Sequence, residues 1–82
     1  ADRRESERAA QRAFETAPSG QATVWNNPDS GNRGTITPTR TFQTDNGQYC
    51  REFQQTVVIG GQEEQAHGTA CRQPNGSWRI VG

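Results

Sequence analysis

Two cysteines, Cys50 and Cys71, are the residues of this sequence best suited to covalent chemistry. The dipeptide Gly60-Gly61 lies midway between them, and glycines readily adopt the positive φ angles that a two-residue hairpin loop needs. Folding the chain about these glycines places the two cysteines opposite each other at a non-hydrogen-bonded site, where Cα atoms lie about 4.5 to 5.5 Å apart. The sequence therefore predicts a cross-strand disulfide, with two free buried thiols as the alternative.

The same pair could instead act as a redox dithiol. Catalytic dithiols are closely spaced, and Cys50 and Cys71 are not. We therefore expect a structural role for both. A structural disulfide persists in secreted, cell-surface and periplasmic proteins, so the pair also predicts an oxidising compartment.

His67 is the only histidine. In the predicted hairpin it faces Gln54, and no second metal ligand or activated hydroxyl has a useful spacing. The turn-rich segment 27–34 has only a loose likeness to a calcium loop, because the ordered carboxylates are missing. We expect an exposed structural histidine, no metal site, no cofactor and no enzymatic activity.

Three arginines are the remaining candidates for a binding site. Pairing across the predicted hairpins places Arg40, Arg51 and Arg72 on adjacent strands and on one side of the sheet. Their stems could cover apolar surface while the guanidinium groups meet Glu7, Glu15 or helix carbonyls. The alternative is an anion site for phosphate or carboxylate groups.

The composition predicts one small domain with a thin core. The 82 residues include three Ile, four Val and three Phe, and no Leu, Met or Lys. So small a core needs a covalent link, which agrees with the predicted disulfide. A net charge of zero gives no case for nucleic acid binding. The lack of a signal peptide, a membrane-length apolar segment and an initiator Met suggests a processed piece of a longer protein.

A helix is expected over residues 1–17, which are rich in helix formers. One face of this helix carries small residues and one aromatic: Ser6, Ala9, Ala10, Ala13, Phe14 and Ala17. On the predicted sheet, Ala66, Gly68 and Ala70 form a row of small side chains. Such a row leaves a shallow trough, and we expect the alanine face of the helix to pack there.

A second hairpin is predicted at Asn46-Gly47, a dipeptide typical of two-residue loops. In that register Phe42 shares a face with the aromatic residues of the next strand, whereas a three-residue loop would place it with the cysteines. We favour the first because it brings the aromatic side chains together. Pro38 has no N–H to donate, so the strand at residues 35–43 must be at an edge or bulged there.

These elements predict an α+β fold. The N-terminal helix packs on one face of a four- to five-stranded antiparallel meander sheet over residues 20–82, and one cross-strand disulfide links two of its strands. The whole chain, residues 1–82, would be a single domain. The second face of the sheet, rich in Thr and Gln, is left to solvent or to a partner.

Three stretches of the sequence resemble a known family: residues 25–32 (WNNPDSGN), 49–53 (YCREF) and 68–74 (GTACRQP). Together with the residues between them, they make residues 16–81 similar to the carboxy-terminal domain of the rickettsial-type seventeen-kilodalton surface antigen family. The resemblance implies an outer-membrane lipoprotein of the Gram-negative cell envelope, lipidated upstream of this domain. It supplies no catalytic residues.

Two functions remain open from the sequence. The first is a non-catalytic cell-envelope domain with a structural or binding role, on the periplasmic or surface-exposed side of the outer membrane. The second is a small periplasmic inhibitor or adaptor that binds a partner, such as a cell-wall hydrolase, through its open sheet face or an exposed sheet edge. The partner is unknown in both, nucleic acid is not expected, and any membrane contact would come from an upstream anchor.

Overall fold

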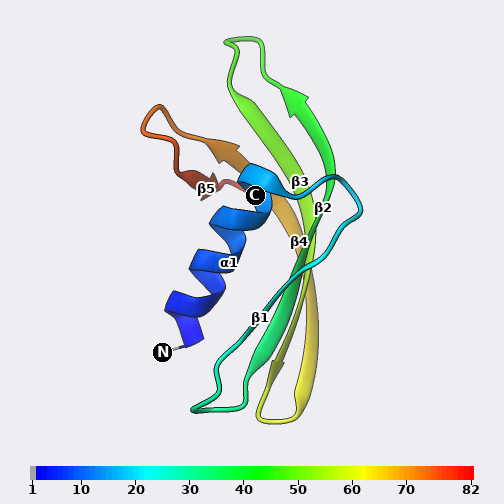
Figure 1. Cartoon of the computed structure of the whole chain (residues 1–82). Coiled ribbons are helices and arrows are strands. Elements are labelled where there is room, and N and C mark those ends of the chain that lie inside the picture. Colours follow the sequence, from blue (N-terminus) through cyan, green and yellow to red (C-terminus); the bar gives the residue numbers. More distant parts are fainter. Residues whose placement is uncertain (1) are drawn as a thin grey trace.

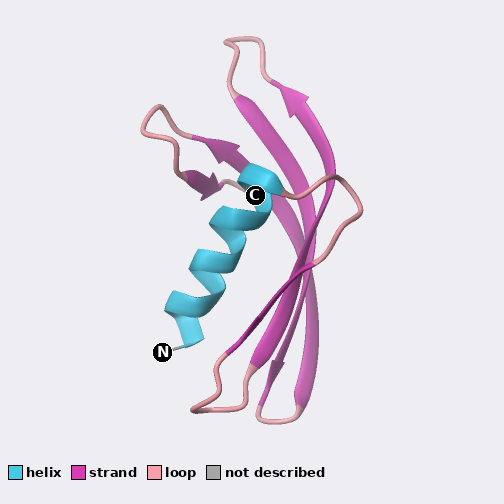
Figure 2. Ribbon diagram, in the orientation of Figure 1, coloured by secondary structure: helices cyan, strands magenta, loops and turns pink. Residues whose placement is uncertain are grey.

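The computed structural model describes residues 2–82, with side chains described from Glu7 onward. One helix precedes five strands: α1 (Asp2–Thr16), β1 (Thr23–Asn26), β2 (Arg33–Gln43), β3 (Tyr49–Ile59), β4 (Gln62–Arg72) and β5 (Trp78–Ile80). The strands form one antiparallel sheet in the order β1-β2-β3-β4-β5, and α1 lies on one side of it (Figure 1; Figure 2). The predicted α+β fold class is confirmed.

The sheet is longer than the helix that covers it. Strands β2, β3 and β4 have 11 residues each, which corresponds to about 36 Å of extended chain. The 15 residues of α1 span only about 22 Å. The hairpin ends therefore extend past the helix at both ends of the sheet (Figure 1).

The hairpin of β3 and β4 has the predicted register. Gly60 and Gly61 form its two-residue loop with φ angles of 58° and 81°. Pairing runs without interruption from Ile59 opposite Gln62 to Cys50 opposite Cys71. Turn chemistry and strand alternation agree here, and both glycines supply the left-handed backbone that the loop needs.

The register between β2 and β3 differs from the prediction. The loop contains three residues, 45–47, with Gly47 at a φ of 86° and Thr44 donating its N–H to Gln48 O at 2.9 Å. The Thr44 hydroxyl also donates to the Asn46 side chain, which supports this longer turn. Phe42 consequently faces Cys50, so the favoured two-residue loop was wrong and the alternative holds.

A bulge in β2 changes the face on which its side chains lie. The register shifts between Pro38 and Arg40, because a proline cannot donate to the ladder and Thr39 is left as an extra residue. The bulge returns Ile36 and Pro38 to the helix side, where both are buried. Beyond it, Arg40 and Phe42 lie on the far side.

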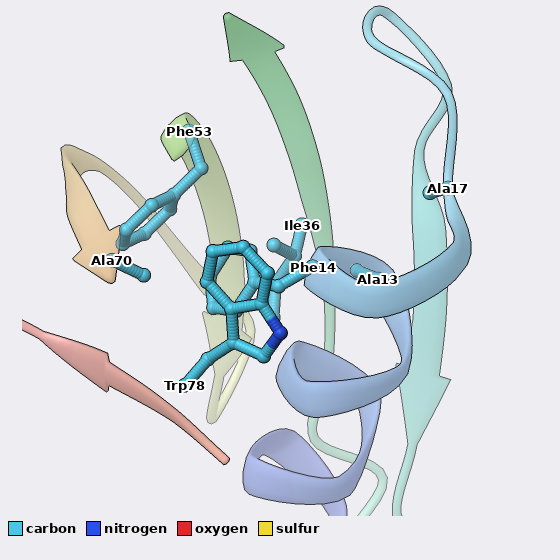
Figure 3. Packing of buried hydrophobic residues seen from close by; sticks show 7 residues of the cluster. All are labelled: Ala13, Phe14, Ala17, Ile36, Phe53, Ala70 and Trp78. Atoms are coloured by element: carbon cyan, nitrogen blue, oxygen red, sulfur yellow. The ribbon is translucent and has the colours of Figure 1, made fainter. Parts of the chain in front are cut away.

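The core lies between α1 and the sheet. Figure 3 shows its cluster of Ala13, Phe14, Ala17, Ile36, Phe53, Ala70 and Trp78. The Phe14 ring packs against Phe53 at 5.1 Å and against Trp78 at 5.7 Å between centroids. The predicted alanine face is confirmed at its described members, because Ala9, Ala13 and Ala17 are all buried. Ser6 lies outside the described side chains.

The predicted trough is covered only in part. Ala70 is fully buried, but Ala66 is exposed. At Gly68 a Cβ would overlap with the Gly82 carbonyl oxygen and lie 3.2 Å from the Phe53 ring, so this glycine accommodates the chain end and Phe53 rather than α1. Packing of the helix along the whole row was therefore wrong, because the chain end and Phe53 occupy the surface at Gly68.

Candidate functional site

The predicted disulfide is confirmed. Cys50 and Cys71 are joined with an S–S distance of 2.06 Å and a Cα–Cα distance of 4.0 Å, and both residues are buried. The bond lies on the face of the sheet opposite α1, with Phe42 facing Cys50 and Arg79 facing Cys71. It links β3 and β4 at the end of the hairpin that packs on the core.

Arg51 caps the carboxyl end of α1. Its Nη1 donates to the carbonyl oxygens of Ala13 at 3.2 Å and Phe14 at 2.8 Å, while Nε donates to the Thr41 hydroxyl at 2.9 Å. The last carbonyls of a helix lack full intrahelical partners, and α1 has no basic residue in its own last turn. Burial lowers the pKa of Arg51, but an arginine keeps its charge in a protein.

Glu15 connects α1 to the last two strands. Its Oε2 accepts hydrogen bonds from the Trp78 indole at 2.7 Å and from Arg72 Nε at 3.3 Å. The bond from Trp78 first, and then the bond from Arg72, hold the pKa of Glu15 below its ordinary value. The expected contacts of Arg51 with helix carbonyls and of Arg72 with Glu15 are thus both present.

Gln11 closes the outer edge of β5. Its side-chain amide nitrogen donates to the Trp78 carbonyl at 2.8 Å, and its side-chain oxygen accepts the Trp78 N–H at 2.7 Å. This contact was not predicted. The spacing of Gln11 and Glu15 by four residues puts both on one helix face, which was the available signal, but the sequence does not show which strand would meet that face.

Arg40 lies apart from the other two arginines. It forms a salt bridge of 3.3 Å with Glu52 on the far face, and its guanidinium carbon is 5.1 Å from the centre of the Phe42 ring. The prediction that Arg40, Arg51 and Arg72 share one side was wrong for Arg40. The physical cause is the three-residue loop, which pairs Arg40 with Glu52.

The structure therefore contains no band of three arginines. Arg51 is buried and engaged by α1, whereas Arg72 is exposed beside a shallow groove that Gln48 and Tyr49 help to line. Binding of phosphate or carboxylate groups at Arg40, Arg51 and Arg72 stays a prediction. Arg72 has the open surface that such a ligand would need.

His67 faces Gln54 as predicted and is exposed. Together with Thr56 and Gln65 these residues line a shallow polar depression on the sheet. Within the part of the chain that the structure describes, no group of three or more His, Cys, Asp or Glu residues could hold a metal ion. Among the same residues, no helix is both long enough and apolar enough to cross a membrane.

The far end of the β3–β4 hairpin is a continuous exposed part of the sheet. We call it the distal ribbon and define it as residues 54–59 of β3 and 62–67 of β4. Every residue from 62 to 67 is exposed, and Ile59 remains 54% exposed despite its apolar side chain. The ends of β3 and β4 and the loop that joins them extend past the end of α1 (Figure 1).

Comparison with known proteins agrees with the resemblance in the sequence. A sequence profile described as the 17 kDa outer membrane surface antigen matches residues 12–79. The 17 kDa surface antigens of Rickettsia bellii (strain RML369-C) and Rickettsia conorii (strain ATCC VR-613 / Malish 7) are 55% and 58% identical over 80 residues. The alignments cover 98% of this chain and 50% of each relative.

The chain thus spans about half the length of the curated relatives it matches. No solved structure matches it. The match to the profile covers most of the chain and includes the disulfide, the contacts of Arg51 with α1 and the whole distal ribbon. On this basis the chain belongs to the 17 kDa outer membrane surface antigen family.

Proposed function

We propose that this chain is a non-catalytic domain of the bacterial cell envelope that acts by binding through its distal ribbon. The observation that carries the proposal is that one end of the sheet is buried and linked by the disulfide, whereas the other end is exposed. The disulfide and the core residues Phe53 and Ala70 lie toward one end of the β3–β4 hairpin, and the exposed residues 62–67 lie at the other. A rigid scaffold that presents an exposed surface is the usual arrangement of a recognition module.

Membership in a family of surface antigens supports an envelope or surface location. The buried disulfide supports an oxidising compartment, because such bonds persist outside the cytosol. We therefore place the domain at the outer membrane, on its periplasmic or surface-exposed side, as the carboxy-terminal part of a longer lipoprotein. In this arrangement the upstream part of the parent chain supplies the anchor.

The second candidate is a small periplasmic inhibitor or adaptor that binds a partner such as a cell-wall hydrolase. The shallow polar depression formed by Gln54, Thr56, Gln65 and His67 favours it, because a partner could seat a side chain there. The two candidates differ in the partner expected. An inhibitor or adaptor requires one stoichiometric protein, whereas a structural envelope domain does not.

Site-specific photo-crosslinking in the full parent chain tests both. A photoreactive amino acid is placed at Gln54 on the distal ribbon and, as a matched control, at Arg12, which is exposed on the helix. We expect adducts in the envelope from position 54 and none from position 12. A single protein adduct supports the inhibitor or adaptor, and adducts with other envelope components support the first proposal. Equal adducts at both positions, or none, would overturn binding through the ribbon.

Thiol trapping of intact cells tests the compartment. An alkylating reagent should leave Cys50 and Cys71 unmodified in the exported parent chain and should modify both when the chain is retained in the cytosol. Two free thiols in the exported protein would contradict the location.

A further inference from the structure

The outer edge of β4 is open along most of its length. Strand β5 pairs with β4 only at residues 70–72, and the Gly82 carbonyl and the Val81 N–H bind the backbone of Thr69. From residue 62 to residue 68, no described strand lies on the outer side of β4. Such an edge offers unpaired backbone groups to another strand.

The register of the hairpin fixes which backbone groups face outward. Ile59 and Gln62 close the two-residue loop as a hydrogen-bonded pair, so groups alternate from there along β4. Gln62, Glu64 and Ala66 direct their N–H and C=O groups inward to β3. Glu63, Gln65 and His67 direct theirs outward, and the outward bonds of Thr69 two residues later agree with this alternation.

We propose that this edge pairs with the same edge of a second copy of the chain, antiparallel and centred on Gln65. In that register Gln65 faces Gln65 of the second copy, and Glu63 faces His67 of the second copy twice, once in each direction. All three facing pairs are of the hydrogen-bonded kind and exchange two bonds each, about six in all. The proposal deepens the binding role proposed above, on which it rests for the use of this region.

The register centred on Gln65 is more favourable than the registers centred one residue to either side. Centring the pairing on Glu64 would place two glutamates directly opposite each other, which is unfavourable. Centring it on Ala66 would place Glu63 opposite Thr69, whose backbone is already bound by the chain end. Centring on Gln65 instead pairs the acidic Glu63 with the basic-capable imidazole of His67.

The exposed glutamates limit which strands can pair with the edge of β4. Charged residues on an edge strand oppose pairing with unrelated strands. Only a strand with an imidazole or a cation opposite Glu63 relieves that opposition, and the same edge of a second copy has His67 at that place. A contact of seven residues is small compared with a standard interface, so we expect a weak dimer that forms at high local concentration.

Disulfide trapping tests the register. The Gln65→Cys variant should form a covalent homodimer, because facing Cα atoms of a hydrogen-bonded pair lie about 5.5 Å apart. The Glu63→Cys variant is the matched control, since its two copies would lie about 13 Å apart and should not crosslink. Equal trapping of the two variants, or none, would overturn the proposal. Monomers oxidised at Cys50–Cys71 are isolated first, so that the native bond is not exchanged.

A charge exchange gives an independent test. Amide protection from hydrogen exchange at Glu63, Gln65 and His67 should rise with protein concentration, while the inward amide of Glu64 should not change. In the Glu63→Arg and His67→Glu variants, the rise in amide protection with protein concentration should be at least severalfold smaller. The double variant should show the full rise again. Failure of the double variant to regain it, with both single variants folded, would contradict the facing of these residues.

The two proposals can be told apart. Both faces of the distal ribbon stay exposed in the dimer, because pairing uses only the backbone edge of β4. Photo-adducts from Gln54 without trapping at Gln65 would leave the binding role in place and remove the dimer. Trapping at Gln65 without envelope adducts from Gln54 would support the dimer and remove the binding role.

Discussion

The two ends of the β3–β4 hairpin have the same backbone pairing and opposite surroundings. At one end, Cys50 and Phe53 are buried under a disulfide and a helix, and at the other end residues 62–67 are all exposed. The register is continuous between them. Backbone pairing therefore does not by itself fix where stability lies. We expect burial and the covalent link to concentrate stability at the helix end, while the distal ribbon remains exposed.

The largest expected effect comes from shortening a core side chain. Phe53→Ala should lower the free energy of unfolding by about 3–5 kcal/mol, because Phe53 packs against Phe14 in the cluster. The matched change on the distal ribbon, Val58→Ala, should cost less than about 1 kcal/mol. Urea denaturation of both variants gives the two values. Equal losses would contradict an uneven distribution of stability.

Removal of the disulfide should come next. The double change Cys50→Ala and Cys71→Ala should lower the free energy of unfolding by about 2–4 kcal/mol, mainly by freeing the unfolded chain. A new bond at Val58 and Glu63, which face each other at the same kind of site, closes a much shorter loop and should add less. Urea denaturation under non-reducing conditions checks both. A larger gain at the distal site would reverse the comparison.

The two helix-side arginines should differ as their surroundings do. Arg51→Met should cost about 2–3 kcal/mol, because it removes a charged donor from two helix carbonyls and leaves that of Phe14 buried without one, while Ala13 O keeps the Ala17 N–H. Arg72→Met removes an exposed ion pair with Glu15 and should cost less than about 1 kcal/mol. Thermal unfolding of both variants at one pH measures the difference. Similar costs would indicate that Arg51 is not acting as a cap.

The smallest effect concerns acid. The pKa of Glu15 is lower in the folded chain than its ordinary value of 4.5, so its ionised form stabilises the fold. That contribution is present above 4.5 and is lost as the pH falls through the folded pKa. Glu15→Gln should remove this part of the pH dependence and keep the acceptor for Trp78. The free energy of unfolding against pH for both proteins tests it, and parallel curves would contradict it.

The disulfide hairpin could be predicted because three independent signals agree in one register. The glycine pair sets the loop, strand alternation sets the faces, and the two cysteines must meet. The equivalent reasoning failed at β2 because the sequence around Asn46 and Gly47 is compatible with two loop lengths. The choice between the two loop lengths depends on hydrogen bonds of the Thr44 hydroxyl, which no sequence pattern predicts.

The candidate site was predictable to the same extent. The positions of Arg51 and Arg72 were predicted from the β3–β4 hairpin, whose register was correct. The position of Arg40 was predicted from the β2–β3 hairpin, whose register was wrong. The predicted trough for the helix was only half right, because small residues indicate where a neighbour can approach closely but not which segment it will be. The contact between Gln11 and Trp78 required knowledge of the angle between helix and sheet, which depends on the assembled core.

The side-chain amide of Gln11 acts on the Trp78 backbone as a neighbouring strand would. The outer edge of β5 is therefore closed at Trp78 by the chain itself. In the proposed dimer, pairing at β4 ends when two copies have met, because the contact uses the same segment of each copy. Each dimer therefore has no free β4 segment left for a third copy.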